Sequence, residues 1–230
     1  MIHLKCFLSF VFVIGFCFSA FAQSNSSNRS IAIQQIRDLK TGALVVRLKT
    51  NDRSIESYRK AGQTALAEKL SEERKKQNQK LADAFRTYFD YCKVYFIYAR
   101  NTDNLLKGKQ NIFLNDTLEV DTSIHLTEKY FLIAEYGLIT SNMRTDEYHY
   151  KSVNQTEATS SASSTSVVFI SDTTLTQLKE PFPFYQSVYL DNYTRGVERM
   201  NNALHRAFYK LDDSAKEERK RLREQLRKLR

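Results

Sequence analysis

The sequence has little cysteine, glycine or proline, and each shortage excludes a class of protein. Its 230 residues include 3 Cys, 6 Gly, 2 Pro and no Trp. Three cysteines are too few for a disulfide scaffold, and so little glycine and proline excludes a collagen-like or low-complexity chain. Loops that cradle phosphate need several glycines and are nearly excluded. After the N-terminal segment no apolar run is long enough to cross a membrane, which excludes a polytopic membrane protein.

Motifs that carry catalytic chemistry are also missing. The sequence contains no nucleophile elbow, P-loop, dinucleotide-binding glycine motif or zinc-protease helix motif. We therefore predict no catalytic residue and no cofactor. A hydrolase-like enzyme with a site built from dispersed Asp, Glu, His and Tyr residues stays open, because acids far apart in sequence can meet in space.

The first 22 residues have the form of a secretory signal peptide. Lys5 precedes the apolar stretch Cys6–Phe18, and the small residues Ala20 and Ala22 stand at the −3 and −1 positions before Gln23. The Ala-Gln junction resembles the signal peptides of exported Bacteroidota proteins. We expect cleavage between Ala22 and Gln23, and a mature protein that is periplasmic or secreted.

Two other interpretations of this segment are weaker. A retained membrane anchor needs a longer apolar core, and a lipoprotein needs a small residue before Cys17, where Phe16 stands. Cleavage after Ala22 removes Cys6 and Cys17, so Cys92 becomes the only thiol and no internal disulfide can form. We expect Cys92 to be buried as a small hydrophobe beside a strand.

Short β-branched and aromatic runs predict the strands of one sheet. These runs cover residues 43–49, 93–99, 111–114, 130–136 and 166–171. Gly137 is expected to end the fourth strand, and residues 141–151 could extend that strand into a hairpin.

Two long segments predict helices. Residues 55–91 are rich in Ala, Leu, Glu and Lys, and two apolar stripes flank the polar residues 72–80. This segment is either one long helix or two helices that break within 72–80. Residues 191–211 are amphipathic. Ser214 and Glu217 then predict a capping box that begins a helix to the C-terminus.

The order of these elements predicts an α/β or α+β domain. We expect a single sheet of about four to five strands, a long amphipathic helix or two after the first strand, and a C-terminal helical extension. The predicted organisation has a flexible leader at 23–30, one domain at 31–211 with a solvated Ser/Thr-rich loop at 152–166, and a basic helical tail at 212–230.

The formal net charge of +9 is concentrated in part at the C-terminus. The basic residues there are Arg219, Lys220, Arg221, Arg223, Arg227, Lys228 and Arg230. On a helix they surround a thin leucine stripe, so the segment suits an anionic membrane surface or an acidic polymer. It also suits a protein partner that grips the leucines, or a solvated tail. Nucleic acid is not an expected partner, because the segment lacks aromatic residues.

The densest group of metal-ligating residue types is Asp116, Glu119, Asp121 and His125. Oxygen-rich loops hold Ca²⁺, and sets of carboxylates with a histidine hold transition metals. The spacing matches no metal motif, and an acidic surface loop explains it equally well. We therefore predict no metal site and keep these four residues as weak candidates.

These features favour a non-enzymatic exported protein that acts by binding or assembly at the cell envelope. The amphipathic helical residues 55–90 and 197–230 are its expected contact surfaces for a protein partner. A hydrolase-like enzyme and a peripheral binder of anionic membranes or polymers are the alternatives. The sequence does not set the oligomeric state.

Overall fold

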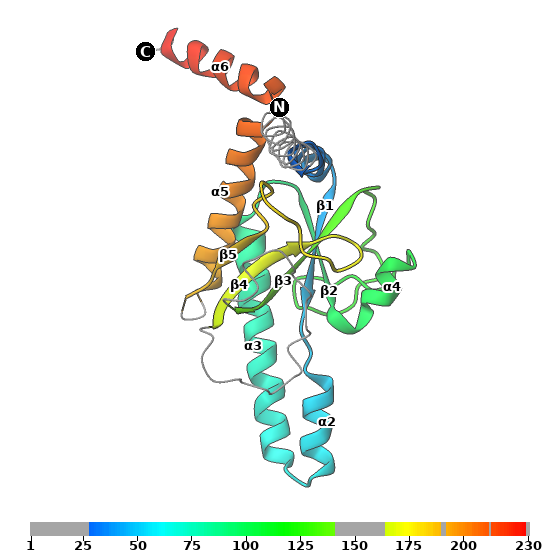
Figure 1. Ribbon diagram of the computed structural model, residues 1–230. Coiled ribbons are helices and arrows are strands. Elements are labelled where there is room, and N and C mark those ends of the chain that lie inside the picture. Colours follow the sequence, from blue (N-terminus) through cyan, green and yellow to red (C-terminus); the bar gives the residue numbers. More distant parts are fainter. Residues whose placement is uncertain (1–27, 141–163, 190–191, 212, 229–230) are drawn as a thin grey trace, which may run out of the picture.

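A single mixed sheet organises the computed structural model, which describes residues 28–140, 164–189, 192–211 and 213–228 (Figure 1). The strand order is β2-β1-β3-β4-β5. The strands are β1 (Ala43–Leu48), β2 (Lys93–Tyr98), β3 (Phe131–Thr140), β4 (Ser164–Ser171) and β5 (Tyr185–Ser187). β1 lies between β2 and β3 and is parallel to both, whereas β4 and β5 follow in antiparallel pairing. The fold is α+β, which confirms the predicted fold class.

Helices cover both faces of the sheet. They are residues 28–41, α2 (Asp52–Lys60), α3 (Thr64–Tyr88), α4 (Thr102–Leu106), α5 (Tyr193–Leu211) and α6 (Asp213–Lys228), and the short 3₁₀ turn η1 (Ala99–Asn101) precedes α4. The larger core packs helix 28–41, α3 and α5 against one face. The smaller core packs Leu105 of α4 and Phe113 against Val45 and Ile133 on the other face. β1 is therefore a central strand, which explains why it is apolar on both sides.

Of the two alternatives for residues 55–91, a break within 72–80 is wrong, and so is a single helix over the whole segment, because two helices separate at Gly62. α2 ends at Lys60, and Gly62 has φ 74°, a value that glycine adopts without steric cost. α3 then runs unbroken through 72–80. Residues 72–77 are polar because this part of α3 is not buried. Apart from Ala67, the buried residues of α3 lie between Asn78 and Phe85.

The leader predicted at 23–30 is helical in its described part. Residues 28–30 open the helix that runs to residue 41, and residues 23–27 lie outside the described residues. Ala32, Ile36 and Leu39 of this helix are buried in the larger core. Their spacing is that of one helix face, so this helix has a signal in the sequence that the strand and helix predictions above do not use.

The boundaries of β3 and β4 differ from those predicted. β3 passes through Gly137 and ends at Thr140, so Gly137 does not end it. A Cβ atom at Gly137 would lie 3.0 Å from Cε1 of Phe169 on β4, so glycine makes room for that ring. β4 begins at Ser164, inside the segment predicted as a solvated loop. The rest of that loop and the predicted hairpin at 141–151 lie outside the described residues.

Two short strand segments were predicted less well. The strand expected at 111–114 is reduced to isolated bridges of Phe113 with Ile97 and of Leu114 with Val120. β5 was not predicted, and it is held by its pairing with β4.

The C-terminal helix is confirmed, but its predicted start is not. The structure describes α6 from Asp213, so Ser214 lies one residue inside the helix. The predicted signal peptide at 1–22 lies outside the described residues. Among the helices that are described, none combines the length and apolarity needed to cross a membrane.

Candidate binding surfaces

The four residues kept as weak metal candidates lie along a tight loop. Asp116 pairs with Nε of Arg86 at 3.2 Å. Asp121 accepts hydrogen bonds from the hydroxyl and the backbone N–H of Ser123, and these bonds lower the pKa of Asp121. Glu119 and His125 are exposed. In the part of the chain that the structure describes, no group of three His, Cys, Asp or Glu side chains is placed to hold a metal ion.

The polar residues of this loop serve a turn that occurs twice in the fold. Oδ1 of Asn115 accepts hydrogen bonds from the hydroxyl and N–H of Thr117 and from the N–H of Glu119. Oδ1 of Asp172 accepts the same three bonds from Thr174 and Thr176. In each loop a side-chain oxygen therefore accepts backbone N–H groups that would otherwise need a backbone carbonyl.

Each copy of the turn contains a leucine whose backbone has the left-handed conformation. Leu118 has φ 61° and Leu175 has φ 62°. Each loop is closed by a bridge, Leu114 with Val120 and Ser171 with Gln177. Asn115, Asp116 and Asp121 thus have structural roles in or beside this loop.

His205 of α5 takes part in a clamp with the loop before β2. Nε2 of His205 and Nδ2 of Asn201 each lie 2.8 Å from Oδ1 of Asp90. Oδ1 of Asn201 accepts the backbone N–H groups of Asp90 and Tyr91. The hydrogen bonds from Asn201 and His205 lower the pKa of Asp90. The clamp holds α5 against this loop, and His149, the third histidine of the predicted mature chain, lies outside the described residues.

Cys92 is partly buried and packs against the larger core. Burial raises the pKa of its thiol to about 12. A thiol with that pKa is almost entirely protonated near neutral pH, so it is a poor nucleophile.

A buried ion cluster that the sequence analysis missed lies on β1 and β3. Glu135 is only 3% exposed, and its carboxylate lies 3.2 Å from Nη1 of Arg47 and 3.7 Å from Nζ of Lys49. Burial lowers the pKa of Lys49, and the charge of Glu135 opposes that effect. A glutamate inside an apolar strand is the signal that could have found the cluster.

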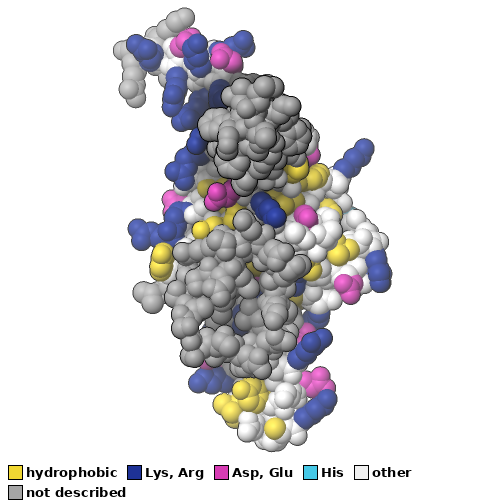
Figure 2. All heavy atoms as spheres, in the orientation of Figure 1, with side chains coloured by type: hydrophobic (Ala, Val, Ile, Leu, Met, Phe, Trp, Pro, Cys, Tyr) yellow, Lys and Arg dark blue, Asp and Glu magenta, His cyan; other side chains and the backbone are white. Residues whose placement is uncertain are grey.

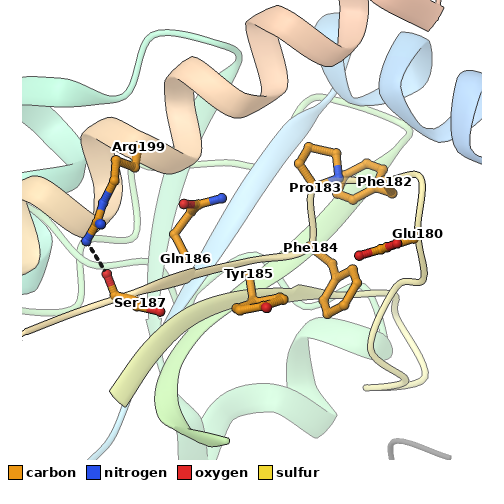
Figure 3. A pocket seen from close by; sticks show the side chains of 8 residues that line it. All are labelled: Glu180, Phe182, Pro183, Phe184, Tyr185, Gln186, Ser187 and Arg199. Carbon is orange, nitrogen blue, oxygen red and sulfur yellow. Dashed lines mark hydrogen bonds between the residues drawn. The ribbon is translucent and has the colours of Figure 1, made fainter. Parts of the chain in front are cut away.

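A pocket of about 330 Å³ lies between β5, the loop that leads into it, and α5. Its lining residues are Glu180, Phe182, Pro183, Phe184, Tyr185, Gln186, Ser187 and Arg199. Figure 3 shows Arg199 and Glu180 at opposite ends, with Gln186 between them. None of the lining residues is a histidine, so the dispersed acid–histidine site considered for a hydrolase is not assembled in this pocket. Sequence reasoning missed the pocket because α5 and β5 meet only in the folded chain.

The α2–α3 hairpin, here called the arm, projects beyond one end of the sheet (Figure 1). Ile55 is the buried residue of α2, and α2 packs mainly on α3. Tyr58 is 39% exposed and Leu66 is 50% exposed. Hydrophobic side chains gather at the lower end of the arm in Figure 2. The arm thus carries apolar surface away from the core.

α6 leads away from the opposite end of the molecule (Figure 1). The exposed basic residues on it are Arg219, Lys220, Arg221, Arg223 and Arg227; Lys228 ends the helix, and Arg230 lies outside the described residues. Leu222 is 49% exposed. Lys and Arg side chains gather over α6 and the adjoining part of α5 in Figure 2. The surface is strongly cationic.

Comparison with known proteins gives no family for this chain. No protein-family model matches it, and no curated protein or solved structure is significantly similar. The geometry and charge of the described residues are therefore the guide to function.

Proposed function

We propose that this protein is exported and acts without catalysis, by binding a protein partner at the cell envelope through the arm. The observation that carries the proposal is the exposure of Tyr58 and Leu66 on a helical hairpin that projects from the sheet. Exposed apolar side chains on a projecting element are typical of partner-binding surfaces, where they act as anchors.

The shape of the molecule supports a role in assembly. The arm and α6 extend from opposite ends, so contacts made by one do not obstruct the other (Figure 1). The arm presents Tyr58 and Leu66, whereas α6 presents basic side chains. Two surfaces of different chemistry allow one chain to join two different structures.

Two features of the chain suit export. Its N-terminal residues have the pattern of a cleavable signal peptide. Cys92, the one thiol left after cleavage at Ala22, is partly buried and has a raised pKa, so it is poorly reactive in an oxidising compartment.

Photo-crosslinking in the native host tests the proposal. A benzoylphenylalanine at position 66 should give one dominant adduct in the envelope fraction. The same group at Lys76, which is exposed on α3 nearer the sheet, should give little or none. Replacing Tyr58 and Leu66 together by serine should abolish the adduct formed from a crosslinker at the neighbouring Ala65.

Two results would contradict this function. The first is equal crosslinking from positions 66 and 76, which would show that the tip of the arm has no preferred contact. The second is a full-length protein that stays in the cytosol with Met1 intact. Tyr58 and Leu66 are both exposed, so the double serine variant should keep the melting temperature of the parent. Loss of the adduct with an unchanged melting curve then shows loss of binding and not unfolding.

A second candidate function, binding to an anionic surface, is favoured by α6. Its exposed arginines and lysines surround most of the helix and attract anionic lipid or polymer, and each basic residue near such a surface adds about 1 kcal/mol. Retention on vesicles of phosphatidylcholine with phosphatidylglycerol should fall when Arg221 and Arg223 become glutamate. Vesicles of phosphatidylcholine alone are the control, and unchanged retention at low salt would end this candidate.

A further inference from the structure

Among the strands that the structure describes, β5 is an edge strand whose outer side has no strand partner. β5 is last in the strand order, so β4 is its only strand partner in the described sheet. Ile170 donates its backbone N–H to the carbonyl of Phe184 at 2.7 Å, and Val188 donates to the carbonyl of Ser166 at 2.7 Å. Backbone groups alternate in direction along an antiparallel pair. Residues 184, 186 and 188 therefore face β4, and residues 185 and 187 direct their N–H and C=O groups outward.

Arg199 confirms this assignment and leaves most of the edge free. Its Nη2 donates to the carbonyl of Ser187 at 2.5 Å, which places that carbonyl on the outer side. Within the described chain, no partner is seen for the N–H and C=O of Tyr185 or for the N–H of Ser187. Unpaired strand edges of this kind are sites where another extended chain adds.

The pocket described above lies along this edge. α5 supplies one wall, and it approaches closely because Gly196 faces Val188: a Cβ at residue 196 would lie 2.6 Å from Cγ2 of Val188. The other residues of the pocket come from β5 and from the loop at 180–184. The result is a groove between an edge strand and a helix (Figure 3).

The charges at the two ends of the groove have opposite signs and no ionic partners among the described residues. Nε of Arg199 donates to the carbonyl of Arg195, and its guanidinium lies 5.9 Å from the ring centroid of Tyr189. A guanidinium has five N–H donors, so further donors remain for a carboxylate. Glu180 is exposed at the other end.

We infer that the groove binds an extended peptide, which adds antiparallel to β5 with an acidic residue at Arg199 and a basic residue towards Glu180. An extended backbone supplies alternating donors and acceptors that match the outward N–H and C=O of Tyr185 and the outward N–H of Ser187. Because β5 runs from the Glu180 end to the Arg199 end, the acidic residue of an antiparallel peptide precedes its basic residue. This site is separate from the arm, and the inference does not depend on the proposed partner of the arm.

Fluorescence anisotropy with the purified mature chain tests the inference. The probe is a labelled peptide of sequence Glu-Thr-Val-Thr-Val-Lys with blocked ends. The first control peptide has the reversed sequence, and the second carries N-methyl groups on the backbone nitrogens that face β5. We expect the probe to bind, and both controls to bind at least about tenfold more weakly, because one misplaces the charges and the other lacks strand donors.

Protein variants separate the charge contacts from general effects. Arg199→Gln should lower the affinity for the probe peptide at least about tenfold, because it removes a charged hydrogen-bond partner. Arg195→Gln, at an exposed arginine one turn earlier on α5, should leave binding unchanged. Equal affinity for the probe and the N-methylated peptide would overturn the inference. So would a dimer of this chain that forms through β5 and excludes the probe. Neither result bears on crosslinking from the arm.

Discussion

Asn115 and Asp172 each organise a loop with a single side-chain oxygen. Each oxygen accepts two backbone N–H groups and one threonine hydroxyl, with distances between 2.6 and 3.1 Å. Both loops place a leucine at positive φ, which is costly for a branched side chain. The hydrogen bonds to the Asx side chain offset that cost.

Replacing Asp172 tests the role of this oxygen. Asp172→Ala should lower the free energy of unfolding by about 1–2 kcal/mol, because two backbone donors lose their acceptor. Asp172→Asn should lie within about 0.5 kcal/mol of the parent, since asparagine keeps an acceptor and already occupies the equivalent position 115. Urea unfolding measures both changes. Equal destabilisation by the two variants would show that the charge, and not the oxygen acceptor, matters.

Glu128 joins the loop before β3 to β2. Its carboxylate lies 2.6 Å from Nζ of Lys93 and accepts hydrogen bonds from Tyr95 at 2.9 Å and Thr127 at 3.0 Å. Burial raises the pKa of Glu128, but these partners outweigh burial and lower the pKa to about 2. A depressed carboxyl pKa stabilises the fold above the ordinary pKa of glutamate, and that stabilisation disappears as the pH falls.

Because the pKa of Glu128 is lowered in the folded protein, stability should fall as the pH falls. The contribution of Glu128 should be lost between about pH 5 and pH 2. Glu128→Gln should cost about 1 kcal/mol at neutral pH, since Lys93 is exposed and solvent screens the pair. Its urea midpoint should also change less with pH in that range. Glu56→Gln, in an exposed pair with Lys60, is the control. Parallel pH curves for Glu128→Gln and the parent would contradict this assignment.

At the scale of elements, close approach decides where α5 lies. Gly196 lets the first turns of α5 contact Val188, which follows β5. Gly62 is different, because no atom lies within 4 Å of a Cβ built there and only its φ of 74° requires glycine. Close packing thus requires glycine at position 196, and the backbone conformation requires glycine at position 62.

Gly196→Ala tests the contact between α5 and β5. Alanine favours a helix by about 1 kcal/mol over glycine, but overpacking costs about 1–3 kcal/mol. We expect a net loss of stability, which thermal unfolding measures. Val188→Ala in the Gly196→Ala background should recover part of the loss, because it removes the methyl group that clashes. If Gly196→Ala stabilised the protein, α5 would be able to shift away from Val188 without loss of stability.

The sequence predicts elements well where a pattern is long. β1, β2 and α5 follow from apolar runs or from helical spacing over many residues. β5 has three residues and no pattern of its own, so only its pairing with β4 reveals it. The pocket could not be predicted for a related reason, because Arg199 and Ser187 meet through tertiary packing.

At the scale of the whole molecule, burial divides the chain into a packed body and an arm. The body holds the sheet and both cores. The projecting part of the arm, residues 52–76, has few buried residues, which are Ile55 and Ala67. Local stability follows burial, so the two parts should open independently.

Hydrogen exchange measures this difference. Amides of α2 and of residues 64–76 should exchange faster than those of β1, which is buried along nearly its whole length. The second half of α3, from Asn78 to Phe85, should exchange slowly because it packs on the sheet. Uniform protection along α3 would show that the arm and the body unfold as one unit.

The topology of the sheet has a consequence for the newly made chain. Ala43 of β1 pairs with Lys93 on one side and Phe131 on the other, so the central strand has no neighbour until much of the polypeptide has been synthesised. Contacts between such distant residues form slowly, because a large loop must close first. The sheet therefore forms later than one built from local hairpins. If the protein is exported as proposed above, such a delay would help it to pass through a translocation channel before it folds.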